Sequence, residues 1–431
     1  MPAFRSQKTL LTLAVALSAI AVHAHADSFN RIASFGVIHN LPEGTEQSQE
    51  TSPEIIAASE DGNTLVYSDS PFEALGFVDI TDAKKPVAGG IVKLDGEPTS
   101  VAITGQTVLA GVNTSESYSK PSGYLLALGL KERDELVRCD LGGQPDSVAV
   151  SKDGRYVAVA IENERDEDLN DGELPQLPAG WVTIVPVKNG LPQCDKMTKV
   201  DMTGLAEIGA TDPEPEFVDI NNLGEIVVTM QENNWMAVID RNGKVISEFD
   251  AGLVTLEGID NKKDGKLNMV DTIENVRREP DAVKWIGNDH FATANEGDYK
   301  HEAPGQAKRG GSRGWTIFNK NGSVVYESGS SYERALASTG YWPEKRAEKK
   351  GVEPESVEVA IYGDTRYIFV GAERANAIGV YKANDLSNPE LVTILPTGIG
   401  PEGLVAIPER NLFISANEVD KEKSVTIYSL D

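Results

Sequence analysis

A repeated proline motif constrains the fold of this 431-residue chain more than any other feature of its sequence. At seven places a proline is followed by a polar residue, usually acidic, and then by a stretch of alternating apolar residues such as 147–150. Alternation with a period of two is typical of a β-strand, and a recurring unit is typical of a repeat architecture. The seven pairs are Pro53-Glu54, Pro98-Thr99, Pro145-Asp146, Pro215-Glu216, Pro280-Asp281, Pro354-Glu355 and Pro401-Glu402.

Each repeat contains further apolar segments, enough for a small antiparallel sheet. A turn such as Asp153-Gly154 leads to a second strand such as 156–161, and third strands such as 124–128 follow in every repeat. A fourth strand, for example 245–249, is recognisable in all repeats except the last, where the chain ends after three. The segment 31–37 reads as the strand that completes this last unit.

These observations predict an all-β fold, a seven-bladed β-propeller with four-stranded blades and a ring closed by an N-terminal strand. A solenoid or a pair of β-sandwiches is the alternative architecture. The repeats are longer than the ~40–45 residues of a compact propeller repeat, so the excess length must lie in loops.

The long connections are predicted to share one face of the propeller. The turns between first and second strands are short, and the long segments either follow a second strand or precede a first strand. Both kinds of connection lie at the same edge of an up-and-down blade, and loops on a rigid scaffold often carry function. The long segments are 162–180, 203–213, 251–278, 297–314 and 329–352, and we expect a short helix within 332–350.

Carboxylates are expected to gather on this functional face. One set follows the repeat prolines at the start of the first strands, and a second set stands where the second strands end. Carboxylates at close quarters either take up protons or bind cations, and oxygen ligands favour hard cations such as Ca²⁺. The sequence therefore predicts Ca²⁺ as a cofactor; the alternative is that the acids cap backbone N–H groups or pair with arginines. The predicted metal ligands are Glu54, Asp146, Glu216, Glu232, Asp281, Glu355 and Glu402.

The first 26 residues predict a signal peptide. Arg5 and Lys8 precede the uncharged apolar run 10–22, and Ala24-His25-Ala26 supplies a small-residue cleavage pattern. The run is short for a membrane span, and no later segment is long and apolar enough to replace it. We therefore expect a periplasmic or secreted protein without a membrane span, in which residues 27–431 form a single propeller domain and a monomer.

Export also bears on the two cysteines, Cys139 and Cys194. An oxidising compartment permits a disulfide between them. Similar phrases follow both, at 140–142 and 200–202, and favour the bridge over two unpaired buried thiols.

The net charge limits the class of partner. Acidic residues outnumber basic ones by 67 to 40, which gives a formal charge of −27. A surface of this charge repels phosphate backbones, so we expect no nucleic-acid partner.

Basic residues concentrate in two of the long segments, 297–314 and 332–350. Basic loops beside an acidic centre that holds a metal would suit an anionic substrate such as a phosphate ester. The alternative is that these loops form salt bridges with the acidic ones. The chain contains no Gly-x-Ser-x-Gly, His-Glu-x-x-His or Walker motif, and His301 is the histidine placed to act as an acid or base.

Five phrases of the sequence point to a known family: Gln144-Pro-Asp-Ser-Val, Glu279-Pro-Asp-Ala-Val, Ala294-Asn-Glu-Gly-Asp298, Glu353-Pro-Glu-Ser-Val and Gly400-Pro-Glu-Gly-Leu404. They resemble those of exported bacterial propellers called choice-of-anchor I proteins, and the resemblance is strongest from about residue 212 to 431. This family is often labelled alkaline-phosphatase-like and is similar to phytase-like esterase propellers, which hold calcium with carboxylates in a cleft on one face. The present chain lacks the serine nucleophile and histidine-rich zinc pattern of true alkaline phosphatases, and no phytase ligand is matched residue by residue.

Two functional hypotheses follow. The first is a calcium-dependent hydrolase of phosphate or other anionic esters, in which Glu296, His301 and Glu373 are the candidate catalytic residues. Its substrate-binding residues would be Lys300, Arg309, Arg313 and Arg374. The second is a non-catalytic propeller that binds a ligand, a protein or an envelope component, since a fold alone does not give a function. The expected partner is an anionic small molecule or an envelope component.

Overall fold

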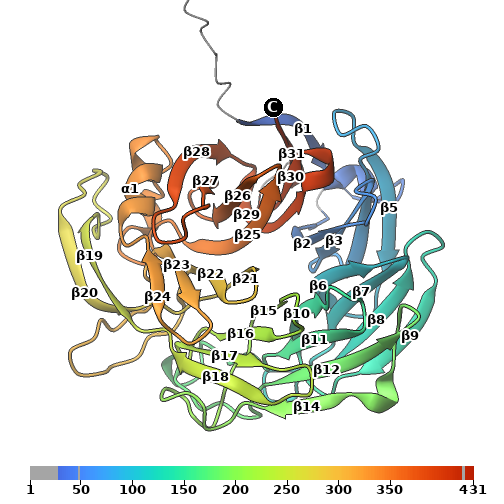
Figure 1. The fold of residues 1–431 in the computed structure, drawn as a ribbon, viewed down its shortest axis with the longest axis horizontal. Helices are drawn as coiled ribbons and strands as arrows, with labels where there is room; N and C mark the ends of the chain where they lie inside the picture. Colours follow the sequence, from blue (N-terminus) through green and yellow to red (C-terminus); the bar gives the residue numbers. More distant parts are fainter. Residues whose placement is uncertain (1–27, 47–48, 420–422) are drawn as a thin grey trace, which may run out of the picture.

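The protein is a seven-bladed β-propeller in a computed structural model that describes residues 28–46, 49–419 and 423–431. Seven antiparallel sheets form the blades, six with four strands and one with a short fifth strand. Figure 1 shows the blades arranged around a central axis. The first strands of successive blades contact one another around the ring and lie closest to the axis. The predicted fold class is therefore confirmed. The predicted signal peptide at 1–26 lies outside the described residues.

Blades 1 to 4 follow one another along the chain. Blade 1 comprises β2 (Pro53–Ala58), β3 (Thr64–Asp69), β4 (Ala74–Asp79) and β5 (Val87–Lys93). Blade 2 comprises β6 (Glu97–Thr104), β7 (Thr107–Asn113), β8 (Gly123–Gly129) and β9 (Glu135–Asp140). Blade 3 comprises β10 (Pro145–Val150), β11 (Tyr156–Ile161), β12 (Trp181–Lys188) and β14 (Thr198–Asp201), with β13 (Leu191–Pro192) paired to the end of β12. Blade 4 comprises β15 (Val218–Ile220), β16 (Ile226–Met230), β17 (Trp235–Ile239) and β18 (Val245–Asp250).

Blades 5 to 7 complete the ring. Blade 5 comprises β21 (Val283–Ile286), β22 (His290–Asn295), β23 (Gly314–Asn319) and β24 (Val324–Glu327). Blade 6 comprises β25 (Pro354–Tyr362), β26 (Thr365–Ala372), β27 (Ala377–Lys382) and β28 (Glu390–Pro396). Blade 7 comprises β29 (Ile399–Ile407), β30 (Leu412–Val419), β31 (Ser424–Leu430) and the N-terminal strand β1 (Phe29–Gly36).

The ring is closed as predicted, because β1 pairs antiparallel with β31. The closing strand begins two residues earlier than expected, and Val37 starts a short 3-10 helix, η1 (Val37–Asn40). Phe29 at the start of β1 packs edge-on against Tyr367 and Phe369 of blade 6, with ring centroids 5.3 Å and 5.1 Å apart. The closing strand therefore joins blade 7 to its neighbour as well as completing its own sheet.

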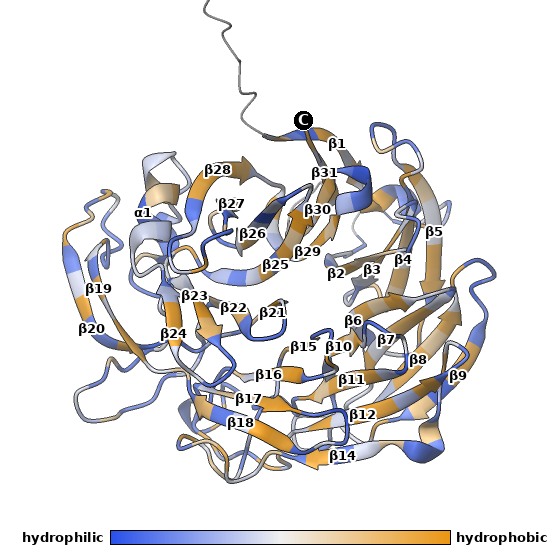
Figure 2. Ribbon diagram, viewed as in Figure 1, coloured by the Kyte–Doolittle hydropathy of each residue, from blue (hydrophilic) through white to orange (hydrophobic). Residues whose placement is uncertain are grey.

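Apolar patterning explains which strands lie inside a blade. All six residues of β11 are buried, because this second strand packs against both neighbouring blades, whereas β18 alternates between half-buried and exposed residues at the outer edge. The core is correspondingly divided into seven apolar clusters, one between each pair of neighbouring blades. Figure 2 shows the apolar residues concentrated along the strands of the blades.

Two of the predicted long loops contain regular structure. Segment 251–278 forms a hairpin of β19 (Leu253–Ile259) and β20 (Asp271–Arg277), which lies outside the ring in Figure 1. Segment 329–352 contains the short helix α1 (Ser331–Ser338), which begins one residue before the stretch in which a short helix was expected, and it is followed by η4 (Glu344–Arg346). The other 3-10 turns are η2 (Asn170–Gly172), η3 (Cys194–Lys196) and η5 (Pro408–Arg410). No helix among the described residues is long and apolar enough to cross a membrane.

A disulfide joins the expected cysteines. Cys139 lies in β9 of blade 2 and Cys194 lies in η3, which follows the third strand of blade 3. The bridge therefore links two neighbouring blades at their outer edge.

Candidate functional site

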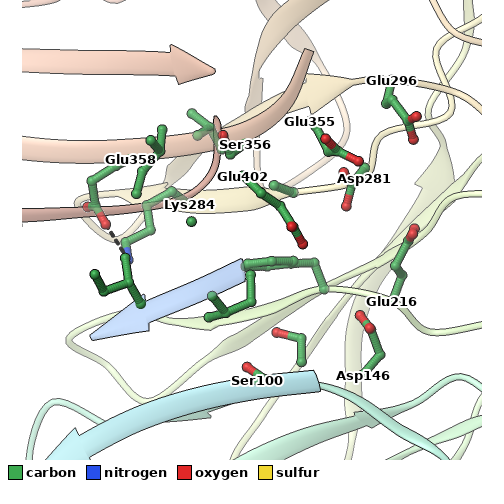
Figure 3. A pocket seen from close by; sticks show the side chains of 18 of the residues that line it. Ser100, Asp146, Glu216, Asp281, Lys284, Glu296, Glu355, Ser356, Glu358 and Glu402 are labelled. Carbon is green, nitrogen blue, oxygen red and sulfur yellow. Dashed lines mark ion pairs between the residues drawn. The ribbon is translucent and has the colours of Figure 1, made fainter. Parts of the chain in front are cut away.

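The axis of the propeller contains a cavity of about 200 Å³ whose wall is rich in carboxylates, and we call this cavity the channel. The residue after each repeat proline stands at the start of the strand nearest the axis, so the repeat itself brings these acids together. Figure 3 shows their side chains pointing toward one another across the axis. The lining carboxylates of this channel are Asp146, Glu216, Asp281, Glu296, Glu355, Glu358 and Glu402.

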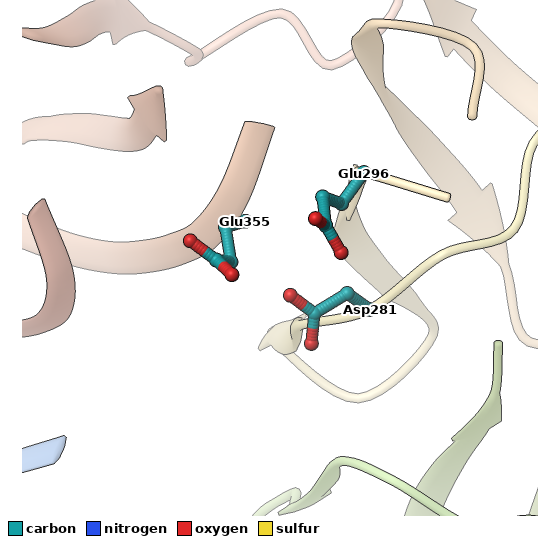
Figure 4. Close-up of side chains that lie close together, drawn as sticks. All are labelled: Asp281, Glu296 and Glu355. Atoms are coloured by element: carbon teal, nitrogen blue, oxygen red, sulfur yellow. The ribbon is translucent and has the colours of Figure 1, made fainter. Parts of the chain in front are cut away.

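Three of these carboxylates form the tightest group. Asp281, Glu296 and Glu355 each offer one oxygen, and these oxygens lie within 4.8 Å of one another (Figure 4). We call these three residues the carboxylate triad. Asp281 precedes β21, and Glu296 follows β22 of the same blade, while Glu355 is the second residue of β25 in the next blade. Antiparallel pairing holds the first two at one edge, because the Asp281 N–H donates to the carbonyl oxygen of Ala294 at 3.0 Å.

Burial changes the protonation of the channel. Burial and then the charge of Glu296 raise the pKa of Asp281 well above its usual range, and burial followed by Glu296 and Glu373 does the same for Glu355. Burial also raises the pKa of Asp146 to about 7. Like charges in a desolvated space disfavour ionisation, so the channel holds protons near neutral pH unless a cation replaces them.

Two basic residues neutralise the edge of this acidic region. The Lys350 ammonium lies 2.5 Å from Glu296 Oε1 and 3.1 Å from Asp298 Oδ1. The Arg165 guanidinium lies 2.8 Å from Glu232 Oε1 and 2.7 Å from Asp298 Oδ2. Salt bridging between the loops, the alternative left open by the sequence, therefore accounts for Glu232 and for part of the charge on Glu296.

Buried oxygens without a hydrogen-bond partner remain in the channel. Oε2 of Glu216 and Oε2 of Glu355 are both buried, and neither has a partner among the described residues. A buried carboxylate oxygen without a partner is costly unless it is protonated or bound by a cation. These two oxygens are therefore the atoms of the channel at which a proton or a cation is needed as a partner.

The remaining predicted metal ligands lie apart from the triad. Glu54 accepts a hydrogen bond from the Ser70 hydroxyl, and burial raises its pKa to about 8. Glu232 is engaged by Arg165 and does not line the channel cavity. The structure thus brings Asp281 and Glu355 together with Glu296, a residue that the sequence assigned to catalysis.

The predicted substrate-binding residues are not gathered at the channel. Arg313 is 1% exposed, and its guanidinium donates to the carbonyl oxygens of Ala347 and Lys349, both at 2.9 Å, so it holds a loop in place. Arg374 is exposed and is ion-paired with Glu353 at 3.1 Å and with Glu373.

The other two basic residues and the histidine belong to the loop 297–314. Lys300 is exposed and forms a backbone bridge with Arg309, which is partly exposed. The ring of His301 stacks on Tyr299 with centroids 5.7 Å apart, and its Nδ1 lies 3.7 Å from Glu173 Oε2. None of these three residues lines the channel cavity.

Sequence reasoning missed Arg165, Asp298 and the pair of Lys284 with Glu358. Lys284 Nζ lies 3.1 Å from Glu358 Oε2 in the channel wall (Figure 3). A signal was available for Arg165, which is the single basic residue in the acidic run 162–168. No comparable signal distinguishes Lys350 from the other lysines of its segment.

Comparison with known proteins extends over most of the chain. The family model described as Choice-of-anchor I domain matches residues 54–211, 198–310 and 301–386. No curated protein matches the sequence.

Solved structures share the fold at low identity. Kuenenia stuttgartiensis hydrazine synthase is 14% identical over 90% of this chain and 98% of its own, with a TM-score of 0.56. The RRP9 WD40 repeats are 9% identical over 94% and 100%, with a TM-score of 0.58. The structure of U3-55K is 9% identical over 88% and 96%, with a TM-score of 0.56. At such identities these likenesses show the propeller fold alone.

Proposed function

The chain belongs to the choice-of-anchor I domain family, and from this premise we propose that it is an exported propeller whose central channel binds a divalent cation, Ca²⁺ foremost. Domains of this family occur in exported and cell-surface proteins, and a disulfide agrees with an oxidising compartment. We place the protein in the periplasm or outside the cell, as a monomer.

One observation carries the proposal: the oxygens of Asp281, Glu296 and Glu355 lie within 4.8 Å of one another. Three carboxylate oxygens from two neighbouring blades match the hard oxygen ligands that Ca²⁺ prefers. The buried, unpaired Oε2 of Glu355 supports a ligand at this point, because a cation would satisfy it.

The charge of the region agrees with this proposal. Lys350 supplies one positive charge to Glu296 and Asp298, so the triad still has a net negative charge when its three carboxyl groups are ionised. A divalent cation would compensate that balance and displace the protons that the raised pKa values of Asp281 and Glu355 favour.

Thermal unfolding of the metal-stripped mature protein, titrated with Ca²⁺ and separately with Mg²⁺, tests the proposal. We expect Ca²⁺ to raise the melting temperature in a saturable way, because a ligand that binds only the folded state stabilises it. Asp281→Asn and Glu355→Gln should abolish the rise. Glu402→Gln is the matched control, since Glu402 lines the same channel outside the triad. An absence of any response in the wild-type protein would remove the metal proposal.

A second candidate function is hydrolysis of phosphate or other anionic esters by the calcium-loaded protein. Arg374 favours it, because part of its guanidinium-bearing side chain stays accessible beside the buried Glu373. Bound calcium would polarise an ester oxygen and lower the pKa of water. On this hypothesis Glu296 would move the proton, because of the candidates Glu296, Glu373 and His301 it is the one that lines the channel. Lys300 and Arg309 would attract the anion from the loop 297–314.

Turnover of 4-nitrophenyl phosphate, measured with and without Ca²⁺, separates the two functions. A hydrolase should show calcium-dependent turnover that Arg374→Ala reduces by about tenfold or more, since Arg374 would contact the anion. Calcium binding without turnover would leave a non-catalytic binding propeller, whose partner would be an anionic small molecule or an envelope component.

A further inference from the structure

A second cavity lies on the same face as the mouth of the channel, between two loops. One loop, 114–122, joins β7 to β8 and the other, 162–180, joins β11 to β12, and both connect a second strand to a third strand. The cavity has a volume of about 240 Å³ and is lined by Tyr118, Leu169, Pro175, Leu177 and neighbouring polar residues. We call this cavity the loop groove.

The loop groove exposes large apolar side chains. Tyr118 is 46% exposed, Leu169 is 51% exposed and Leu177 is 62% exposed. Single exposed apolar residues are ordinary, but three that line one cavity on a charged protein are typical of an interaction site. None of the three belongs to a strand of the propeller, so packing of the fold does not require them at these positions.

The shape of the loop groove is fixed by Gln176. Its amide donates to the carbonyl oxygens of Asp166 at 3.0 Å and Leu169 at 3.3 Å, and its Oε1 accepts from the Asp166 N–H at 3.0 Å. Its backbone N–H donates to Asp212. The loop therefore presents Leu169 and Leu177 in a set arrangement, and preorganisation lowers the entropic cost of binding.

The rim of the loop groove is negatively charged. Asp166 lines the cavity, and Glu167 and Asp168, which follow it in the chain, are exposed. The charge of Glu164, then burial, and then the charge of Asp166 raise the pKa of the Tyr118 phenol. The basic side chains nearby do not offset this charge. Lys120 is ion-paired with Glu116 at 3.0 Å, and Arg165 is turned inward to Glu232 and Asp298.

We propose that the loop groove docks a basic segment of a partner protein. The apolar stems of lysine or arginine side chains would lie against Leu169 and Leu177, and their charged ends would reach the carboxylates of the rim. The face of the Tyr118 ring would add a cation–π contact. This combination of an exposed aromatic ring, aliphatic side chains and carboxylates favours a cationic segment over an anionic or a purely apolar one.

Binding of labelled synthetic peptides to the mature protein tests this proposal. The probes are an alternating lysine–leucine hexapeptide and its glutamate–leucine and serine–leucine counterparts, measured by fluorescence anisotropy with divalent cations chelated. We expect the lysine peptide to bind at least about tenfold tighter than the other two, and to lose affinity as salt screens the rim. Chelation keeps the outcome independent of the channel, so failure of the calcium site would not affect it.

Variants locate the binding. Tyr118→Ser combined with Leu177→Ser should lower the affinity for the lysine peptide by about tenfold or more, since both apolar contacts are lost. Leu223→Ser is the matched control, because Leu223 is 63% exposed in a turn between a first and a second strand, on the opposite face. Equal affinity for the three peptides, or equal affinity of the double variant and the control, would overturn the proposal.

Discussion

The Nζ of Lys350 lies 2.5 Å from Oε1 of Glu296, so a member of the carboxylate triad already has a tethered cation as its partner. Lys350 is itself 8% exposed and also pairs with Asp298 at 3.1 Å. Arg313 fixes the backbone just before Lys350, because it binds the carbonyl oxygens of Ala347 and Lys349. The lysine is therefore held where its charge competes with any cation that enters the triad.

Replacing Lys350 should separate metal affinity from stability. In Lys350→Met the buried Glu296 loses its cationic partner and keeps only the amide of Gln231, so we expect the metal-free protein to be about 3 kcal/mol less stable. The net charge of the triad and its surroundings becomes more negative, and the repulsion between Lys350 and the metal ion is removed. We therefore expect Ca²⁺ to bind about tenfold more tightly. Isothermal titration and urea unfolding measure the two effects. Lys350→Arg keeps the charge and is the control; weaker calcium binding in Lys350→Met would contradict the prediction.

The disulfide should contribute substantially to stability. Cys139 and Cys194 are 55 residues apart in sequence and connect blade 2 to blade 3. A loop of this length corresponds to about 4 kcal/mol of stabilisation on the chain-entropy model. We expect the double variant Cys139→Ser, Cys194→Ser to unfold at lower urea concentration by this free energy. Dithiothreitol should lower the urea concentration at which the wild-type protein unfolds and leave that of the double variant unchanged. A decrease in both proteins would show that the effect does not come from this disulfide.

The fold was predictable because each blade repeats the same signals. A proline, an alternating strand, a short turn and a buried second strand such as 156–161 recur seven times, and period-two patterning identifies strands well. The hairpin at 253–277 was missed, because the lysines, aspartates and glycine between its strands read as a loop. The strand 253–259 alternates between exposed and buried residues, and its buried side chains pack in a small apolar cluster that lies apart from the blades.

The candidate site was predictable only in part. The repeat places Asp281 and Glu355 at equivalent positions of neighbouring blades, so their proximity follows from the fold. The pairing of Arg165 with Asp298 spans 133 residues and depends on the paths of two irregular loops. Sequence periodicity carries no information on such paths, which is why the counter-ions of the channel were not identified.

Arg165 should hold the loops of three blades together. Its guanidinium lies 2.8 Å from Glu232 in blade 4, 3.6 Å from Glu214 and 2.7 Å from Asp298 in blade 5. Arg165→Met leaves the buried carboxylates of Glu232 and Glu214 without this partner, whereas Asp298 keeps Lys350. We therefore expect a loss of about 3–5 kcal/mol. In this variant, the rate of backbone amide hydrogen exchange should rise within 162–180 and 297–314 and should stay at the wild-type value in blade 7.

A control distinguishes this effect from a general loss of charge. Arg155→Met removes an arginine from the same blade, but Arg155 is exposed and pairs with Asp153 at 3.5 Å, so its removal should cost less than about 1 kcal/mol. Equal destabilisation by the two substitutions would contradict a special role for Arg165.

Raised carboxyl pKa values predict that the metal-free protein becomes less stable as the pH rises. Burial raises the pKa of Glu54 from 4.5 to about 8, and that of Glu373 to about 9. Between the ordinary and the raised value the folded protein keeps a proton that the unfolded chain has lost. The free energy of unfolding therefore falls as the pH rises from about 4.5 and stops falling above the raised pKa.

Glu54→Gln tests the sign of this dependence, because glutamine resembles the protonated acid. In chelator we expect the variant to match the wild-type melting temperature near about pH 5 and to exceed it near about pH 9, where wild-type Glu54 is ionised in a buried site. Glu390→Gln is the control, since Glu390 is exposed at the outer strand β28 and should give a curve parallel to the wild type. Asp298, whose pKa is lowered by Lys350 and Arg165 against the effect of burial, changes stability only below about pH 4 and leaves this window undisturbed. Parallel curves for Glu54→Gln and the wild-type protein would mean that Glu54 titrates normally and that its burial does not disfavour the charge.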